Sequence, residues 1–342
     1  MDMQSAIKAV TEKQDLSATE MEQVMRTIMT GEATPAQIGG FLIGLRMKGE
    51  TVDEITAAAK VMRDLASKVN TTGDFPVDTC GTGGDASGTF NISTASAIVA
   101  AAAGCTVAKH GNRSVSSKSG SADLLEKAGL NLGLPPEKVE ECINQTGIGF
   151  LFAPNHHGAM KHAIGPRKEM GARTIFNILG PLTNPAGAPN QVLGVFCRSW
   201  VLPLAQVLKQ LGSRHVLIVN AEDGLDEISI AAPTSVAELK DGKITEYSIT
   251  PEQFGLNRAS LDQIKAADSD TSLDIINGIF SSSKEGKLEA ASNIVALNAG
   301  AAIYVSGKAE SLEAGIKLAA KAISDGSAQN KLSQLVKLTQ QL

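Results

Sequence analysis

The stretch Phe75-Pro-Val-Asp-Thr-Cys-Gly-Thr-Gly-Gly-Asp85 is a short apolar run that ends in a glycine-rich loop. Residues 75–79 predict a strand and residues 93–103 predict a helix, so the loop joins a strand to a helix. Gly81, Gly83 and Gly84 let the backbone approach a ligand closely, and a helix start offers N–H groups to an anion. The loop has neither the GKS or GKT of a P-loop nor a clean GxGxxG pattern. Taken alone, it is equally compatible with a phosphate cradle and with a tight turn.

Strand-length and helix-length segments alternate after this loop. Strands are expected at residues 105–109, 191–197 and 214–220, and helices are expected at residues 119–128 and 201–211. This alternation predicts an α/β sheet with crossover helices. Residues 236–249 interrupt it with a hairpin signal around Lys240-Asp-Gly-Lys243, and helical patterning returns from about residue 272.

The first seventy residues or so read as helices. Three capping boxes, formed by Ser17 with Glu20, Thr34 with Gln37 and Thr51 with Glu54, mark successive helix starts. Gly31 and Gly49 follow the first two of these helices and are expected to stop them in the left-handed conformation. An apolar stripe at helical spacing predicts a core face or a subunit contact rather than a ligand groove; it consists of Met21, Val24, Met25, Ile28 and Met29. The polar residues 70–74 mark the expected domain boundary.

Composition excludes several classes of protein. The 31 Lys and Arg against 36 Asp and Glu give a net charge of −5, and aromatic residues make up only 4%, which argues against nucleic-acid binding. The N-terminus shows no signal peptide, and the longest apolar run, residues 95–108, is too short to span a membrane; it predicts a buried helix running into a buried strand. The four cysteines have no CxxC spacing and are expected to be reduced thiols in the cytoplasm.

Two further segments support the phosphate cradle. Lys109-His-Gly-Asn-Arg113 lies at a strand end and brings a point charge and a bidentate guanidinium beside the serine-rich residues 114–121. After the strand ending at Asn220, the turn Asp223-Gly-Leu-Asp-Glu227 carries two adjacent carboxylates. Such a pair suits a divalent cation bound together with phosphates, although the turn in isolation reads as an ordinary acidic turn.

Five segments, taken together and in this order, resemble the anthranilate phosphoribosyltransferase family of tryptophan biosynthesis. They are GTGGD at 81–85, NIST at 91–94, KHGNR at 109–113, GPRKEMGARTIFNILGPLTNP at 165–185 and LDE at 225–227. The resemblance covers essentially the whole chain, and the run at 165–185 is the most discriminating piece. The related pyrimidine nucleoside phosphorylases share the fold type and a glycine loop, but this run is not expected in them.

The resemblance implies a small α-helical lobe and a larger α/β lobe with a central, mostly parallel sheet, and an active site at the hinge. The helical lobe would comprise residues 1–70 with a middle segment, about 165–188, and the α/β lobe residues 74–164 and 189–342. It also implies a cytoplasmic homodimer joined through the helical lobe, with no nucleic-acid or membrane partner.

The implied reaction transfers the phosphoribosyl group of 5-phosphoribosyl 1-pyrophosphate (PRPP) to the amine of anthranilate, with Mg²⁺ as cofactor. By resemblance, the PRPP-binding residues would be Gly81, Gly84, Asp85, Thr89, Asn91, Ile92, Ser93, Thr94, Lys109, His110, Gly111, Asn112, Arg113, Ser114, Val115, Ser116, Ser117 and Ser121. Anthranilate would contact Gly81, Asn112, His157, Met160 and Arg167, and the metal would contact Ser93, Asp226 and Glu227. His157-Gly158 stands where the family has His-Pro, which leaves the stiffness of that loop open.

An arylamine keeps its lone pair free at neutral pH, so the reaction demands no strong base. His110 is the candidate general base, and a positioning or wall role is favoured for it. His156, His157 and His162 lack the i, i+4 spacing of a helical zinc pair. Arg167, after a turn-like segment at 162–166 and before an expected helix at 168–176, either grips the anthranilate carboxylate or pairs with a neighbour such as Glu169. A nucleoside phosphorylase and a nucleic-acid-binding relative without the arylamine site remain the alternatives, and Arg167 and the acidic charge count against the second.

Overall fold

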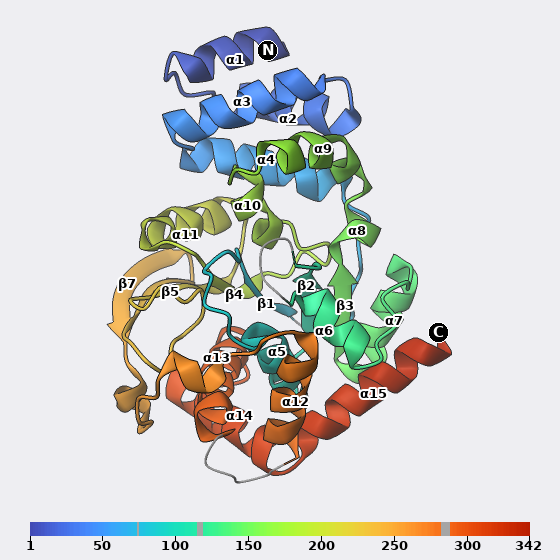
Figure 1. Ribbon diagram of the computed structural model, residues 1–342, viewed down its shortest axis with the longest axis vertical. Helices are drawn as coiled ribbons and strands as arrows, with labels where there is room; N and C mark the ends of the chain where they lie inside the picture. The colour runs from blue at the N-terminus through green and yellow to red at the C-terminus, as the bar shows by residue number, and fades with distance from the viewer. Residues whose placement is uncertain (74, 115–118, 282–287) are drawn as a thin grey trace.

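The computed structural model describes residues 1–73, 75–114, 119–281 and 288–342, and it has a helical bundle stacked on a larger α/β body (Figure 1). The bundle begins with α1 (Met3–Thr11), α2 (Ala18–Thr30), α3 (Pro35–Lys48) and α4 (Val52–Leu65). The three expected capping boxes are confirmed at the starts of α2, α3 and α4. Gly31 ends α2 in the left-handed conformation, as expected. The same expectation is wrong for Gly49, which ends α3 with a φ of 93° but a ψ of 126°, outside the left-handed helical region.

The α/β body is built on one seven-stranded sheet with the order β3-β2-β1-β4-β5-β6-β7. Its strands are β1 (Val77–Gly81), β2 (Val107–Gly111), β3 (Ile148–Phe152), β4 (Asn190–Gly194), β5 (His215–Ala221), β6 (Thr234–Lys240) and β7 (Lys243–Ile249). The first five strands are parallel, and β6 and β7 form the expected hairpin, which adds two antiparallel strands at one edge. The expected fold class, a helical lobe plus an α/β lobe with a mostly parallel sheet, is confirmed.

Helices cover both faces of this sheet. One face carries α5 (Ile92–Ala102) and α13 (Glu289–Val305), and the other carries α11 (Val201–Gln210), which also packs on α4 of the bundle. Further helices of the α/β body are α6 (Ser121–Lys127), α7 (Pro136–Thr146), α12 (Ser269–Phe280), α14 (Leu312–Ser324) and α15 (Ser327–Gln341), with short 3₁₀ turns η3 (Arg198–Trp200), η4 (Pro251–Phe254) and η5 (Leu261–Ile264). No helix among the described residues is both long and apolar enough to cross a bilayer.

The two faces of the sheet belong to two hydrophobic cores. Successive residues of β5 alternate between them: Leu217 packs in the core under α5 and α13, and Ile218 in the core under α11. This second core continues into the helical bundle and contains the whole methionine-rich stripe of α2, including Met21 and Met25, which are fully buried. Of the two roles expected for the stripe, the structure therefore supports the core and excludes a subunit contact.

The chain returns to the bundle in its middle part. After α8 (Ala153–His156) and η1 (Gly158–Met160), α9 (Lys161–Met170) packs against α2 and α3, and α10 (Phe176–Leu179) with η2 (Gly180–Leu182) runs back past α4. The turn expected at 162–166 and the helix expected at 168–176 are wrong: α9 includes Pro166 and stops at Gly171, which adopts the left-handed conformation. Packing of the buried Ala163 and Pro166 outweighs the cost of about 3 kcal/mol that an interior proline brings.

Candidate active site

The strand order reverses between β1 and β4, and open α/β sheets bind ligands beyond the carboxyl ends of the strands at such a point. There the acidic turn lies directly on two strand ends. A Cβ added to Gly81 would approach Asp226 Oδ2 to 2.6 Å, and one added to Gly194 would approach the Asp226 carbonyl oxygen to 1.5 Å. The N–H of Gly83 donates to Asp226 Oδ2 at 2.9 Å. Glycine at these positions therefore allows the predicted metal-binding turn to touch the glycine-rich loop.

Gly83 and Gly84 have φ values of 67° and 80°, the left-handed region that favours glycine. The loop between β1 and α5 is fastened at its far end, because Thr89 pairs with Lys265 in an isolated bridge and its side chain lies 3.2 Å from the hydroxyl of Ser87. The loop is thus anchored at both ends, with its central glycines available for close approach.

Carboxylates crowd this site. Burial, and after it the charge of the nearby Asp85 carboxylate, raise the pKa of Asp226 to about 7. Burial and the charge of Asp226 raise the pKa of Glu227 well above its usual value. Raised pKa values in two adjacent carboxyl groups show that too little positive charge lies nearby to stabilise their ionised forms. A bound divalent cation would supply that positive charge. The pair therefore fits a Mg²⁺ site built from few carboxylates and substrate phosphates.

Among the residues that the structure describes, no three His, Cys, Asp or Glu side chains converge as a metal site. The expected metal contacts Ser93, Asp226 and Glu227 include only two such groups. Burial lowers the pKa of Lys109, an effect that Asp78, Cys80 and Glu227 oppose, so Lys109 is the cation beside the carboxylates. Its Nζ donates to the Thr79 carbonyl oxygen at 2.6 Å and lies 3.5 Å from Ser93 Oγ. Lys109 is therefore held just beneath the start of α5.

The start of α5 is open. Asn91 precedes the helix without capping it, and Thr94 Oγ1 is buried with no hydrogen-bond partner among the described residues. The Ser93 carbonyl accepts from Thr79 Oγ1 at 3.0 Å, and the Ser93 main chain partly opposes the rise in the pKa of Glu227. The expected phosphate-binding group at 91–94, Ile92 included, thus surrounds an uncapped helix N-terminus, which is suited to an anion.

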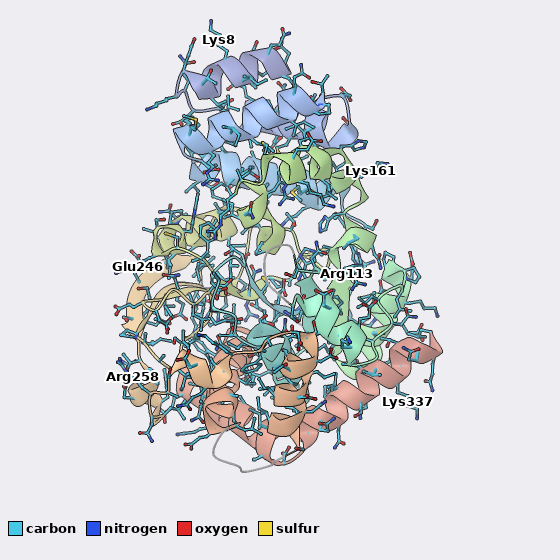
Figure 2. All side chains as sticks on the ribbon, in the orientation of Figure 1. Lys8, Arg113, Lys161, Glu246, Arg258 and Lys337 are labelled. Atoms are coloured by element: carbon cyan, nitrogen blue, oxygen red, sulfur yellow. The ribbon has the colours of Figure 1, made fainter. Side chains whose placement is uncertain are left out.

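The second loop follows β2, which ends at Gly111. Here the structure gives Arg113, which is labelled in Figure 2, other partners than expected. Its guanidinium pairs with Asp123 at 3.0 Å and Glu126 at 2.7 Å, both on α6. The N–H of Ser114 donates to Asp123, and the hydroxyl of Ser121 donates to the Asn112 carbonyl at 3.3 Å. The expected PRPP contacts Val115, Ser116 and Ser117 lie outside the described residues.

Three buried histidines lie near the end of β2. The ring centroids of His110 and His157 are 5.1 Å apart, and the Nε2 atoms of His110, His156 and His157 have no partner among the described residues. Burial, together with the charges of His157 and His156, lowers the pKa of His110 well below its usual value. A neutral and weakly basic imidazole agrees with a wall or positioning role for His110 better than with that of a strong general base.

Arg167 and Met160 lie on the segment that returns to the bundle. The Arg167 guanidinium lies over the Phe176 ring, 5.0 Å from its centroid, and forms no ion pair with any described carboxylate, Glu169 included. Burial without such a partner lowers its pKa. The structural alternative, a helix-start ion pair with Glu169, is therefore wrong, and the guanidinium keeps its capacity for a carboxylate ligand.

The sequence reasoning missed residues that support these loops. Asp78 is fully buried in β1, accepts from the His110 N–H at 3.1 Å and from Asn184 Nδ2 at 2.8 Å, and so joins β2 to the 165–185 segment. Arg173 donates to the Gly84 carbonyl and stacks on Phe196 at 4.4 Å. A lone acid in an otherwise apolar strand was the one signal that could have identified Asp78.

Two family models match the chain. The helical bundle domain of a glycosyl transferase family matches residues 4–66, and the a/b domain of the same family matches residues 74–329. Anthranilate phosphoribosyltransferase from Thioalkalivibrio sulfidiphilus is 66% identical over 339 residues, which cover 99% of this chain and 99% of that protein. The enzyme of this name from Alkalilimnicola ehrlichii is 61% identical over 342 residues, with 100% of both chains covered.

Solved structures agree with these relatives. Anthranilate phosphoribosyltransferase from Thermus thermophilus superposes with a TM-score of 0.92 at 42% identity, covering 98% of this chain and 99% of that one. The Saccharomyces cerevisiae enzyme, in complex with PRPP and Mg, gives a TM-score of 0.91 at 25% identity. This match covers 99% of this chain and 98% of the yeast chain. Since the sequence matches run over nearly its whole length, the chain belongs to the anthranilate phosphoribosyltransferase family.

Proposed function

We propose that PRPP and anthranilate react at the carboxyl ends of β1 and β4, between the α/β body and the returning segment. As a member of its family, the chain transfers the phosphoribosyl group of PRPP to the amine of anthranilate, releasing pyrophosphate, in tryptophan biosynthesis. The observation that carries the placement is the meeting of three features: the uncapped start of α5, the buried Lys109 and the Asp226–Glu227 pair, whose pKa values are raised.

The two loops would hold PRPP. Gly81, Gly84, Asp85 and Thr89 belong to the loop that touches Asp226, and the open α5 start would take a phosphate through its N–H groups and hydroxyls. From the second loop we assign His110, Gly111, Asn112, Arg113, Ser114 and Ser121 to the same substrate. Arg113 would have to exchange a carboxylate of α6 for phosphate, which its half-exposed position permits.

Anthranilate would lie between the second loop and the returning segment. Gly81 and Asn112 would form one side, and His157, Met160 and Arg167 the other. A guanidinium can hold a planar carboxylate by two parallel hydrogen bonds, and this grip would aim the neighbouring amine at the ribose. The lack of an ion-pair partner at Arg167 among the described carboxylates supports this assignment.

Mg²⁺ is the cofactor, as in the yeast relative whose structure contains PRPP and Mg. Asp226, Glu227 and Ser93 would hold it, and when bound it would neutralise the charge of the pyrophosphate. In the reaction the nitrogen–C1 bond forms, the C1–oxygen bond to pyrophosphate breaks and the nitrogen loses a proton. The chain contributes Lys109 and the α5 start as fixed positive charge on the pyrophosphate side, and fixed relative positions for both substrates.

The returning segment, about residues 165–188, would complete the helical lobe of residues 1–70, leaving residues 74–164 and 189–342 as the α/β lobe. The packing of α9 on α2 and α3 supports this division. We also propose a cytoplasmic location, since all four cysteines are free thiols.

A homodimer would form through the helical lobe. On α3, an apolar stripe at helical spacing faces outward: Ala36, Gly40 and Met47 are exposed and Ile43 is partly exposed. Met47 has 77% of its surface accessible. An apolar stripe that stays largely exposed in the single chain supports a second copy of this chain as its partner.

Arg167→Ala tests the acceptor placement. We expect the apparent KM for anthranilate to rise at least about tenfold, equivalent to ~1.4 kcal/mol, because a charged hydrogen-bond partner is lost. The KM for PRPP should change much less, and Arg167→Lys should not restore the wild-type value, since Lys cannot form the two parallel bonds. Lys168→Ala, an exposed neighbour on α9, is the control. Equal shifts in both KM values, or a lower Tm with normal kinetics, would show that Arg167 is structural.

A further inference from the structure

Asn91 directly precedes α5 but does not cap it. Asparagine is among the preferred N-cap residues because its side-chain oxygen accepts from the N–H of the second or third helical residue, the third here being Thr94. No such hydrogen bond forms, and within the described part of the chain the Thr94 N–H has no acceptor. Since asparagine favours capping, other contacts must hold the Asn91 side chain away from the start of α5.

Two serines hold the Asn91 carboxamide. Ser272 of α12 donates to Asn91 Oδ1 at 2.8 Å and accepts from the Asn91 N–H at 3.0 Å. Ser119 of the second loop also donates to Oδ1, at 2.9 Å, while Asn91 Nδ2 donates to the Ser119 carbonyl at 3.3 Å. Both lone pairs of the carboxamide oxygen are therefore occupied, and neither is available to the end of α5.

Ser272 is well placed to impose this arrangement. It is fully buried, and α12 lies beside α6 of the second loop (Figure 1). Three residues earlier on the same helix face, Ser269 donates to Ser119 Oγ at 2.9 Å. Upstream of α12, the Ile264 carbonyl accepts from the Phe90 N–H at 3.0 Å. The segment 264–272 thus contacts both the glycine-rich loop before α5 and the second loop, which follows β2.

We propose that Ser272 is a positioning residue for PRPP: it keeps the Asn91 carboxamide off the start of α5, so that the Thr94 N–H stays free for a phosphate oxygen. Without the Ser272 hydroxyl, the Asn91 N–H loses its acceptor and Oδ1 loses one of its two donors, so that only the Ser119 contacts oppose rotation of the carboxamide onto the helix end. The protein's own cap would then compete with the substrate. This inference rests on the proposed function, which places PRPP at the start of α5.

Steady-state kinetics of Ser272→Ala test the inference. We expect the KM for PRPP to rise about fivefold, within the range for one neutral hydrogen bond, with kcat and the KM for anthranilate within about twofold of wild type. Titration with inorganic pyrophosphate and Mg²⁺ should give a similarly weakened Kd. Ser272→Thr, which keeps the hydroxyl, should restore the KM for PRPP. Ser96→Ala is the matched control, because Ser96 is equally buried but its hydroxyl has no partner among the described residues.

Ser93→Ala separates failure of this inference from failure of the proposed function. If Ser93→Ala raises the KM for PRPP while Ser272→Ala leaves both this KM and the pyrophosphate Kd unchanged, Ser272 is merely structural, whatever happens to its Tm. If Ser93→Ala also has no effect on the KM for PRPP, the placement of PRPP at α5 is itself wrong.

Discussion

Asp226 shows how a single residue joins the fold to the chemistry. Its main chain fits only against glycine at the end of β4, and its carboxylate receives the N–H of Gly83 from the glycine-rich loop. The same packing buries the carboxylate and raises its pKa to about 7. Burying the ionised Asp226 carboxylate costs stability, and the neighbouring Glu227 also has a raised pKa. Such pairs are typical of functional sites.

Replacing Asp226→Asn together with Glu227→Gln should reduce turnover at limiting Mg²⁺ at least about tenfold, because the neutral amides cannot hold the cation against pyrophosphate. Folding should not suffer. Unchanged turnover at limiting Mg²⁺ would mean that the two carboxylates form an ordinary acidic turn.

The Tm of the same double variant should depend on pH differently from that of the wild-type protein. An acid whose pKa is raised on folding stabilises the protein below its unfolded pKa of 3.8, and this stabilisation is lost as the pH rises to about 7. Without Mg²⁺, the Tm of the variant minus that of wild type should therefore be larger at about pH 8 than at about pH 5. A constant difference across this range would contradict the raised pKa of Asp226.

At the scale of an element, the glycine-rich loop carries the sharpest prediction. Gly84 has a φ of 80°, and a Cβ there would lie 3.0 Å from the Arg173 guanidinium, which itself donates to the Gly84 carbonyl. Gly84→Ala should therefore strain the loop by about 1 kcal/mol and raise the KM for PRPP severalfold, with a smaller effect on the KM for anthranilate.

Gly104→Ala is the matched control, because Gly104 also has a positive φ but nothing lies within 4 Å of its added Cβ. It should lower the Tm without affecting the KM for PRPP. If Gly84→Ala binds PRPP normally, the loop is only a turn.

Elements with strong local signals were predicted from the sequence within a few residues. The capping boxes of α2, α3 and α4 and the hairpin of β6 and β7 depend on neighbours in the chain, which the sequence displays directly. β3 was missed because its short run, IGFLF, is strand-like only once it pairs with β2. α9 was misread because Pro166 looks like a helix breaker until its packing on the bundle is known.

The residues of the candidate site also fall into a group that the sequence predicts and a group that it does not. The glycine loop, the end of β2 and the acidic turn carry recognisable residue types, and the resemblance to a family placed them in one site. The partners of Arg113, the Asp78–Asn184 bond and the Ser272–Asn91 contacts join residues far apart in the chain. Such contacts follow from the tertiary arrangement, so no local pattern announces them.

At the scale of the whole molecule, the proposed dimer depends on the outward face of α3. Met47→Glu should place a charge on that apolar stripe and shift the protein to monomers, which light scattering would detect as a halved mass. Leu318→Glu is the control, because Leu318 is also an exposed apolar residue, 38% accessible, but lies on α14 of the α/β body. A monomeric wild-type protein, or an unchanged mass for Met47→Glu, would contradict this interface.

The activity itself is tested most directly by the fluorescence of anthranilate. Mixed with the protein, PRPP and Mg²⁺, anthranilate should lose its fluorescence as its amine is joined to the ribose, with one pyrophosphate released for each anthranilate consumed. Omission of PRPP or of Mg²⁺ should abolish the loss. Constant fluorescence in the complete mixture, with release of a free base from a nucleoside and phosphate instead, would contradict the account and assign the protein to the phosphorylases.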